Sequence, residues 1–260
     1  MYAMERQELV ERLLREEGRV GVVDLSARFG VTTETIRRDL ALLEEAGTLR
    51  RVHGGAVATD RGSTVETPVS ERALRKGDAK QAIGRRAAAL LDAGFRGSVY
   101  LDAGTTVAAV ASALPIHLAN SRGGAEIVTH SMTIAHDLAG SDLGLTVIGG
   151  RIRGLTAAAV GAETVNAISH LRPDVAFVGT NGLSEGFGLS TPDPDEAAVK
   201  AAIIAAARRV VVVTDAEKFG AELLVRFGGL TDIDDLVSDA APDSRLANAL
   251  GDAGAEVWVA

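Results

Sequence analysis

Residues that bind anions and hydroxyl groups follow one apolar run of the sequence directly. Asp102 closes the run, Gly104, Thr105 and Thr106 come next, and an Ala- and Val-rich helical pattern starts there. A turn of this type brings backbone N–H groups, hydroxyl groups and the positive end of a helix dipole to one point. The stretch therefore predicts an anion site at the start of a helix, with a carboxylate beside it.

Small and polar residues also follow four other apolar runs. They are Thr129, His130 and Ser131, then Gly149 and Gly150, then Gly179, Thr180, Asn181, Gly182 and Ser184, and finally Asp215 and Lys218. Glycines let a ligand approach the backbone closely, and hydroxyl groups bind phosphate or sugar oxygens. Polar loops are common in such folds, but five of them predict one shared pocket for a hydroxylated, anionic ligand.

Further charged residues lie in the segment "TPDPDEAAVKAAI", which has the spacing of a helix start. Glu196 and Lys200 are four residues apart on one helix face, so they can simply pair with each other. Alternatively, Asp193 or Glu196 faces the pocket and binds sugar hydroxyl groups. Both interpretations stay open at this point.

The elements that must position these residues alternate between strand and helix. We expect strands over 98–102, 125–131, 145–150, 175–181, 210–215, 235–239 and 256–260, and helices over 105–113, 133–139, 160–171, 195–207 and 244–252. This alternation predicts an α/β fold with a mainly parallel sheet. Ligands of such sheets bind at the carboxyl ends of the strands, near the point where the strand order reverses.

The first part of the chain has a different pattern. An amphipathic helix over 4–15 is followed by a short helix that ends at Phe29, with Asp24 or a neighbour as its cap, and by a helix that starts after Thr32 or Thr33. Gly30 supplies the turn between the last two helices, and Gly47 ends the third. This order predicts a helix-turn-helix, and a basic hairpin with Gly54–Gly55 as its turn would follow as a wing.

The third helix would lie in the major groove of DNA. The expected DNA contacts are Thr32, Thr33, Thr35, Arg37 and Arg38 from that helix and Arg50, Arg51, His53 and Gly54 from the wing. Arginine pairs with guanine, and threonine meets a thymine methyl group or a phosphate. Asp39 would repel phosphate, so we expect it to orient Arg38 or to cap locally. A small helical module for protein contact is the alternative.

The composition sets further limits. There is no cysteine, which excludes disulfides and thiolate chemistry and is typical of a cytosolic protein. No apolar run reaches the ~18 residues of a membrane span, and the N-terminus lacks the apolar region of a signal peptide. We therefore expect a cytoplasmic location without membrane contact. The formal net charge is −8, so DNA binding must depend on local features.

The expected domains are a DNA-binding domain over 1–57, a polar linker over 58–74 and an α/β ligand-binding domain over 75–260. Lys80 lies near the start of the first helix expected in the α/β domain. We expect no metal site and no cofactor.

The stretch "LSARFGVTTETIRRDLALLEEAGTLRRVHGGA" resembles the winged helix of the DeoR-type family of bacterial repressors. The second part resembles the sensor domain of that family, which is similar to ribose-5-phosphate isomerase and to CoA-transferase folds. The matching elements are Asp-x-Gly-Thr-Thr at 102–106, Thr-x-Ser at 129–131, Gly149–Gly150, Gly-x-x-Gly at 179–182, Glu196 with Lys200, and Asp215-x-x-Lys218. The family also has a similar Arg…Lys..Ile pattern in its linker and first helix, so the resemblance implies Lys80 as a candidate phosphate contact. His130 departs from the pattern, because the family commonly has Asn there.

The resemblance implies a transcriptional repressor of sugar metabolism genes that binds operator DNA as a homo-oligomer, dimer or tetramer, with a sugar phosphate as effector. The segment "GTNGLS…GLSTPD" is most similar to members tied to fructose utilisation, which implies fructose 1-phosphate. The alternative is a sugar-phosphate isomerase with an appended DNA-binding module. Such an isomerase needs a carboxylate base, and Asp102, Asp193, Glu196 and Asp215 supply the type. However, neutral residues occupy 179–182, where the isomerases carry an acidic loop.

Overall fold

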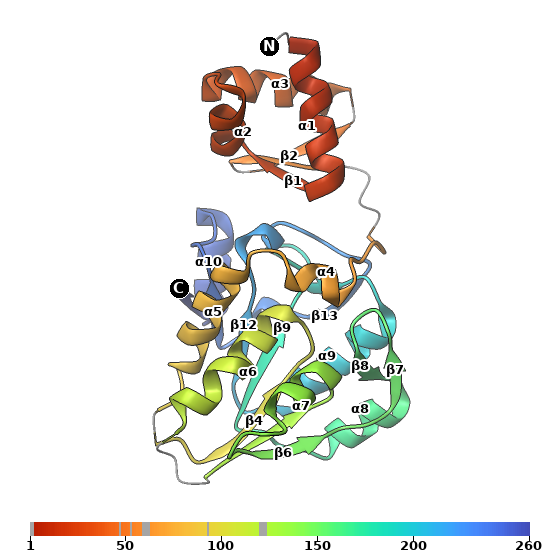
Figure 1. Cartoon of the computed structure of the whole chain (residues 1–260), viewed down its shortest axis with the longest axis vertical. Helices are drawn as coiled ribbons and strands as arrows, with labels where there is room; N and C mark the ends of the chain where they lie inside the picture. The colour runs from red at the N-terminus through yellow and green to blue at the C-terminus, as the bar shows by residue number, and fades with distance from the viewer. Residues whose placement is uncertain (1–2, 47, 53, 59–62, 93, 120–123) are drawn as a thin grey trace. The chain divides into compact units, whose positions relative to one another are not determined.

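The computed structural model describes residues 3–46, 48–52, 54–58, 63–92, 94–119 and 124–260. The chain divides into two compact units, Met1–Val65 and Glu66–Ala260, which we describe separately (Figure 1).

The first unit is a winged helix. Its elements in chain order are α1 (Ala3–Glu17), β1 (Arg19–Gly21), α2 (Val22–Phe29), α3 (Thr33–Glu45), β2 (Leu49–Val52) and β3 (Gly55–Ala58), with the antiparallel strand order β1-β3-β2. Thr32 caps α3, since its hydroxyl accepts the N–H of Thr35. Ile36, Leu40 and Leu43 of α3 pack into the core of this unit, as their spacing predicts.

Three details of the first unit differ from the prediction. Strand β1 was not expected, because three residues between two helices are too few to show a strand pattern. α2 begins at Val22 after the N-cap Gly21, so Asp24 lies in its first turn and is not the cap. Gly55 belongs to β3 and not to the turn, and a Cβ atom there would lie 2.0 Å from the carbonyl oxygen of Val20. Gly47 and His53 lie outside the described residues.

The second unit is built on a parallel seven-stranded sheet with the order β15-β14-β12-β9-β4-β5-β6. The strands are β4 (Gly97–Leu101), β5 (Ala125–Thr129), β6 (Gly144–Val147), β9 (Val175–Gly179), β12 (Val210–Val213), β14 (Asp235–Ser238) and β15 (Glu256–Val259). The seven expected strands are thus all present, and β6 ends earlier than expected, so that Gly149 and Gly150 lie beyond it.

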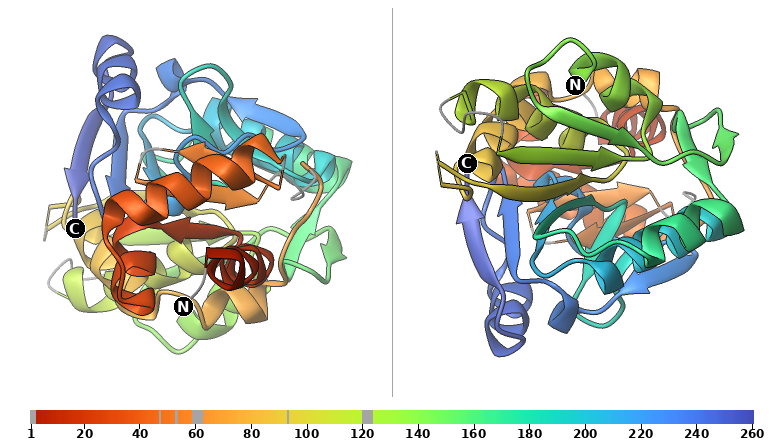
Figure 2. Two further views of the ribbon diagram at one scale, coloured as in Figure 1. Left: turned by 90° about the horizontal axis from the view of Figure 1, so that it is seen from above. Right: turned by 90° about the horizontal axis from the view of Figure 1, so that it is seen from below.

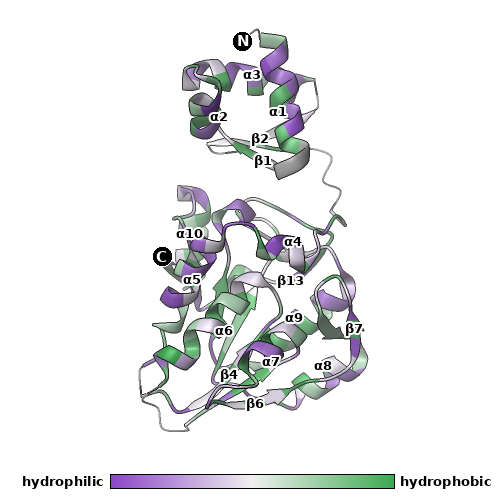
Figure 3. Cartoon of the chain, viewed as in Figure 1, coloured by the Kyte–Doolittle hydropathy of each residue, from purple (hydrophilic) through white to green (hydrophobic). Residues whose placement is uncertain are grey.

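Helices cover both faces of this sheet (Figure 2). The helices are α4 (Val69–Ala73), α5 (Gly77–Ala88), α6 (Thr105–His117), α7 (Met132–Leu138), α8 (Ala162–Ser169), α9 (Pro194–Ala206) and α10 (Ser244–Asp252). Alternate strand residues point to opposite cores: Leu101 packs with α5, α6 and α7, whereas Tyr100 packs with α8, α9 and α10. Hydrophobic residues are concentrated in these central strands (Figure 3).

The strand order reverses between β4 and β9. From β4 the chain continues to β5 and β6 on one side, and from β9 to β12, β14 and β15 on the other. Asp102 follows β4, and Gly179 ends β9, so both lie at this reversal. In open α/β sheets, ligands bind at such a point, outside the carboxyl ends of the strands.

The prediction missed the elements around this edge. An antiparallel sheet is formed by β10 (Gly182–Ser184), β11 (Gly188–Thr191) and β13 (Val225–Gly228), and a two-stranded arm by β7 (Arg151–Arg153) and β8 (Ala158–Val160). Two short 3-10 helices, η1 (Ala216–Lys218) and η2 (Leu230–Asp232), complete the unit. Helix α4 lies inside the segment expected to be a linker, and the compact unit begins at Glu66.

Candidate functional sites

The expected recognition helix presents its basic residues to solvent. Arg37 and Arg38 are both exposed on α3. Arg37 makes only a loose ion pair with Glu34, with Nη1 3.5 Å from Oε2 and with 62% and 74% of the two side chains exposed. Thr33 and Thr35 are half-buried beside the cap Thr32. DNA can therefore replace water on this surface without disturbing the hydrophobic core of the unit.

The wing is described only in part. Arg51 is half exposed and ion-paired, since its Nε lies 2.6 Å from Oε2 of Glu44. Gly54 is exposed in the turn with φ +77°. Arg50 lies in β2, and His53 is outside the described residues. Phosphate contacts by Arg51 would have to compete with Glu44.

Asp39 does not orient Arg38, and that expectation was wrong. Its carboxylate is buried and bonded to Arg6 of α1, with Arg6 Nε 2.5 Å from Oδ2 and Nη2 3.1 Å from Oδ1. The side-chain amide of Gln7 donates to the same carboxylate at 3.3 Å. The prediction failed because Asp39 faces the core, where α1 supplies a cation. Asp39 therefore joins α3 to α1.

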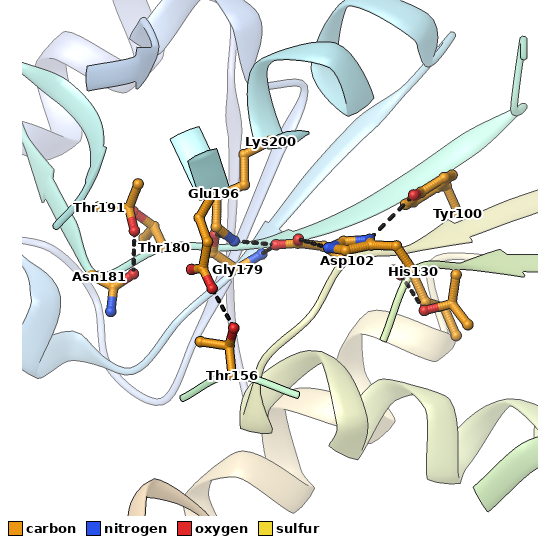
Figure 4. A network of polar contacts seen from close by, with 12 residues as sticks. Tyr100, Asp102, His130, Thr156, Gly179, Thr180, Asn181, Thr191, Glu196 and Lys200 are labelled. Carbon is orange, nitrogen blue, oxygen red and sulfur yellow. Dashed lines mark hydrogen bonds and ion pairs between the residues drawn. The ribbon is translucent and has the colours of Figure 1, made fainter. Parts of the chain in front are cut away.

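Asp102 is the centre of a buried polar network in the second unit (Figure 4). Its Oδ2 accepts the N–H of Gly179 at 2.9 Å and a short hydrogen bond from Nζ of Lys200. Lys200 Nζ also donates to the carbonyl oxygen of Gly179 at 2.9 Å. Oδ1 has no hydrogen-bond partner among the described residues. The network thus joins β4, β9 and α9 at the reversal of strand order and leaves one carboxylate oxygen without a donor.

His130 and Tyr100 continue this row (Figure 4). Tyr100 Oη lies 3.1 Å from His130 Nδ1, and His130 Nε2 lies 3.7 Å from Asp102 Oδ1. Burial lowers the pKa of His130 to about 4, a change that nearby Lys200 increases and Asp102 opposes. Burial likewise raises the pKa of Tyr100. Both rings are therefore neutral at physiological pH, and His130, marked as a departure in the sequence, lies in the candidate site.

Glu196 and Lys200 have different partners. The short hydrogen bond of Glu196 comes from the hydroxyl of Thr156, and Nη1 of Arg153 lies 3.2 Å from its Oε1. Burial raises the pKa of the Glu196 carboxyl, against the opposing effects of Lys200, Thr156 and Arg153. The interpretation as a simple pair within the helix is therefore not what the structure shows, because Lys200 bonds to Asp102.

Several expected contacts hold their own loops together. The Thr129 hydroxyl donates to the carbonyl oxygen of Leu101 at 2.8 Å, and Ser131 is the N-cap of α7. Thr180 donates to the carbonyl oxygen of Gly182 at 2.7 Å, and the Asn181 side chain accepts from Thr191 at 3.1 Å. These hydrogen bonds fix the loops that follow β5 and β9; Thr129 and Ser131 are fully buried, whereas Thr180 and Asn181 are half-buried.

The N-terminus of α6 has no side-chain cap. Gly104 is its N-cap with φ +126°, and Thr105 and Thr106 begin the helix half-buried. Gly149 and Gly150 lie exposed beyond β6, and a Cβ atom on Gly150 would lie 2.0 Å from Oγ1 of Thr164. Gly150 is therefore needed for packing against α8.

A second charged group lies beyond β12. Asp215 is buried, and its Oδ1 has no hydrogen-bond partner among the described residues. Lys218 follows half-buried in η1. Lys80 is also buried, and its Nζ donates to the carbonyl oxygens of Arg72 at 2.5 Å and Arg75 at 2.8 Å. Lys80 thus closes the chain turn after α4, and a ligand phosphate would have to displace these carbonyls.

The sequence interpretation missed Arg153, Thr156, Tyr100 and Glu66. Arg153 contacts Glu196 and also Asp193, the N-cap of α9, with Nε 3.1 Å from Oδ2. The sequence signal for Arg153 was that two arginines follow Gly149–Gly150, but that segment has no recognised strand pattern. Within the described ranges, no cluster of His, Cys, Asp or Glu could hold a metal ion. We also find there no helix long and apolar enough to span a bilayer.

Comparison with known proteins gives matches over nearly the whole chain. The model of the DeoR-like helix-turn-helix domain matches residues 6–61, and that of the DeoR C terminal sensor domain matches 75–240. The "Glycerol-3-phosphate regulon repressor" of Escherichia coli (strain K12) is 32% identical over 97% of this chain and 97% of that protein. The "Uncharacterized HTH-type transcriptional regulator FruR" of Bacillus subtilis (strain 168) is 32% identical over 92% of each chain.

One solved structure is a distant match. A structure of ribose 5-phosphate isomerase A from Methanocaldococcus jannaschii covers 55% of this chain and 54% of its own, with 16% identity and a TM-score of 0.41. The sequence matches, in contrast, confirm the predicted family: the chain belongs to the DeoR family of transcriptional regulators, with a helix-turn-helix DNA-binding domain and a sensor domain.

Proposed function

We propose that this regulator represses sugar metabolism genes and that a sugar phosphate, bound at the reversal of strand order between β4 and β9, controls its DNA binding. The observation that carries the proposal is one juxtaposition: the N-terminus of α6, which has no side-chain cap, begins three residues after Asp102. Helix N-termini favour phosphate, and Oδ1 of Asp102 is an acceptor without a donor in the described part of the chain.

The site residues are part of the proposal. Gly104, Thr105 and Thr106 would hold the phosphate. Thr180, Asn181, Asp193 and Glu196 would bind the sugar hydroxyl groups, and Lys218 would lie at the rim. Because Asp102 is fully buried, it first serves to hold Lys200 and Gly179, and direct contact with the sugar requires a local opening.

The names of two relatives support the ligand class. One is named for the glycerol-3-phosphate regulon and one is named FruR. Fructose 1-phosphate is therefore the first compound to test, and glycerol 3-phosphate is the second. We further propose that the protein works in the bacterial cytoplasm as a homo-oligomer on double-stranded operator DNA, since one winged helix reads few bases.

We do not propose an isomerase. A general base must reach a substrate carbon, and the carboxylate of Asp102 is buried and held by Lys200. The loop 179–182 carries neutral side chains. A coupled isomerisation assay with ribose 5-phosphate checks this directly, and turnover above the background rate would contradict the proposal.

The effector proposal is tested by thermal unfolding with a panel of sugar phosphates. A ligand at 100 times its dissociation constant should stabilise the protein by ~2.7 kcal/mol. Replacing Thr105 and Thr106 by Val should weaken that stabilisation, while Ser112→Ala, exposed on the same helix, should not. Equal stabilisation of both variants would place the phosphate elsewhere.

A further inference from the structure

Arg153 shares one guanidinium among three carboxylates. Its Nη2 lies 2.8 Å from Oε2 of Glu66, its Nε 3.1 Å from Oδ2 of Asp193, and its Nη1 3.2 Å from Oε1 of Glu196. The side chain is only 17% exposed. Two of the three carboxylates belong to the first turn of α9, and the third lies more than 120 residues earlier in the chain.

Glu66 is the first residue of the second unit. Its side chain is 3% exposed, and neither carboxylate oxygen has a well-aligned hydrogen-bond donor within the described residues. Besides Arg153, it has a distant ion pair with Arg72, whose Nη2 lies 3.5 Å from Oε1. A buried carboxylate whose donors are few and poorly aligned is weakly stabilised. The start of the unit is therefore fixed by an attraction that a change in charge nearby can alter.

Through Asp193 and Glu196, Arg153 is also connected to the proposed effector site. Asp193 caps α9, and Glu196 and Lys200 follow on the same helix. Lys200 is bonded to Asp102 at the reversal of strand order. The backbone adds a parallel link, because the N–H of Val69 donates to the carbonyl oxygen of Leu155 at 2.9 Å, two residues from Arg153.

We infer that Arg153 is the positioning residue that couples occupancy of the effector site to the start of the sensor domain at Glu66. One guanidinium cannot satisfy three carboxylates fully. A ligand whose hydroxyl groups bind Asp193 and Glu196 changes how strongly these carboxylates compete for Arg153. The strength of the ion pair between Arg153 and Glu66 changes as a result. The connecting chain to the DNA-binding domain starts at the preceding residue, Val65. This inference depends on the proposed function, because it takes Asp193 and Glu196 as effector contacts.

The test compares Glu66→Gln with a matched control. Arg151→Gln removes another arginine of β7, whose partner Asp195 also lies on α9, but this pair is exposed, and among the described residues Glu66 has ion pairs with Arg72 and Arg153 and not with Arg151. For each protein, we would measure stabilisation by fructose 1-phosphate, glycerol 3-phosphate and ribose 5-phosphate. We would then measure the dissociation constant for a DNA duplex selected by the wild-type protein from a random pool, with and without the sugar phosphate that stabilises it.

We expect Glu66→Gln to bind the sugar phosphate as wild type does but to lose coupling. The ratio of the two DNA dissociation constants should fall about tenfold, within the usual range of allosteric coupling. Arg153→Lys, which keeps the charge but loses the planar fork, should lower the ratio by a smaller factor. Arg151→Gln should leave it unchanged.

The outcomes separate the two claims. If all variants respond to the sugar phosphate like wild type, Arg153 does not couple the site to Glu66, while the proposed function stands. If Arg151→Gln loses coupling as strongly as Glu66→Gln, the effect is a general one of charge in the arm and the inference is overturned. If no sugar phosphate stabilises the wild type, the proposed function fails and this inference fails with it.

Discussion

The two units use charged residues in opposite ways. On α3 of the winged helix, Arg37 and Glu34 are mostly exposed and 3.5 Å apart. In the sensor domain, the side chains of Lys200 and Asp102 are 6% and 1% exposed and directly bonded. The first arrangement leaves charge available to a partner, whereas the second fixes the backbone of three elements. The two pairs therefore differ in what a substitution costs: removing an exposed charge on α3 leaves the fold intact, whereas removing Asp102 or Lys200 leaves a buried charge without its partner.

The winged helix contains one exception that clarifies this difference. Arg6 and Asp39 form a buried pair there, with 8% and 4% of their side chains exposed. Asp39 is next to Arg38 in sequence but one step around the helix, so one faces the core and the other faces solvent. Helical periodicity alone separates the buried charge of Asp39 from the exposed charge of Arg38.

The largest expected effect is on the buried side of the comparison. Asp102→Ala leaves the ammonium of Lys200 buried without its counterion and the N–H of Gly179 without its acceptor. Breaking a buried ion pair in this way costs about 3–5 kcal/mol of the free energy of unfolding. Urea unfolding followed by the fluorescence of Trp258, the single tryptophan of the chain, would report on the sensor domain.

Two further variants sharpen this result. Replacing both partners, Asp102→Asn with Lys200→Met, should recover much of the loss, because no uncompensated charge remains. Arg151→Gln, in an exposed pair, should change stability by less than about 1 kcal/mol. A loss below about 1 kcal/mol for Asp102→Ala would mean that water reaches this carboxylate.

Much of the framework could be predicted from the sequence. The seven parallel strands alternate with helical segments, the third helix of the winged helix has a clear helical period, and Thr32 was one of two expected caps. Strands β7, β8, β10, β11 and β13 were missed because these short segments lie outside the alternation of strand and helix. α4 was missed because it is a helix of one turn in a polar segment with Gly, Ser, Thr and Pro, which has the composition of a linker.

The location of the candidate site in the sensor domain could be predicted from the sequence, whereas its hydrogen bonds and ion pairs could not. Parallel strands bring their carboxyl ends to one edge, so the polar residues after them had to lie at the same edge. Which of them pair was not visible, since Lys200 bonds to Asp102, nearly a hundred residues away, and not to Glu196 four residues before it. The roles of Arg153 and Glu66 could not be predicted, because only the folded position of β7 brings Arg153 next to Asp193 and Glu196 of α9 and to Glu66.

On the exposed side, Arg38→Ala should weaken binding to the selected duplex and leave stability unchanged. A good arginine contact to a base is worth about 1–3 kcal/mol, or roughly ten- to a hundredfold in the dissociation constant. Binding would be followed by fluorescence anisotropy across a salt series, with Arg12→Ala, exposed on α1, as the control of equal charge. Equal losses for both variants would indicate a general electrostatic effect and no recognition by α3.

The smallest expected effect is on the pH dependence of stability, and it arises from His130 in the buried network around Asp102. The pKa of His130 is about 4 in the folded protein, lowered chiefly by burial, whereas an unfolded histidine has a pKa of about 6.5. Between these values the unfolded chain binds a proton that the folded chain does not, so stability falls as the pH falls. From pH 7.5 to 5.5, His130 should cost about 1–2 kcal/mol.

His130→Asn should remove this part of the pH dependence, because the amide does not titrate in this range. Unfolding in urea at pH 7.5 and 5.5, followed by Trp258 fluorescence, gives the difference between wild type and variant, from which the carboxylates common to both cancel. Tyr100→Phe serves as the control, since it removes the hydroxyl 3.1 Å from His130 Nδ1 but leaves the imidazole buried, and so should keep the pH dependence. If wild type and His130→Asn lose the same stability on acidification, His130 is protonated in the folded protein. Water would then reach the network around Asp102, and the charged side chains of the sensor domain would be accessible to solvent, as those of α3 are.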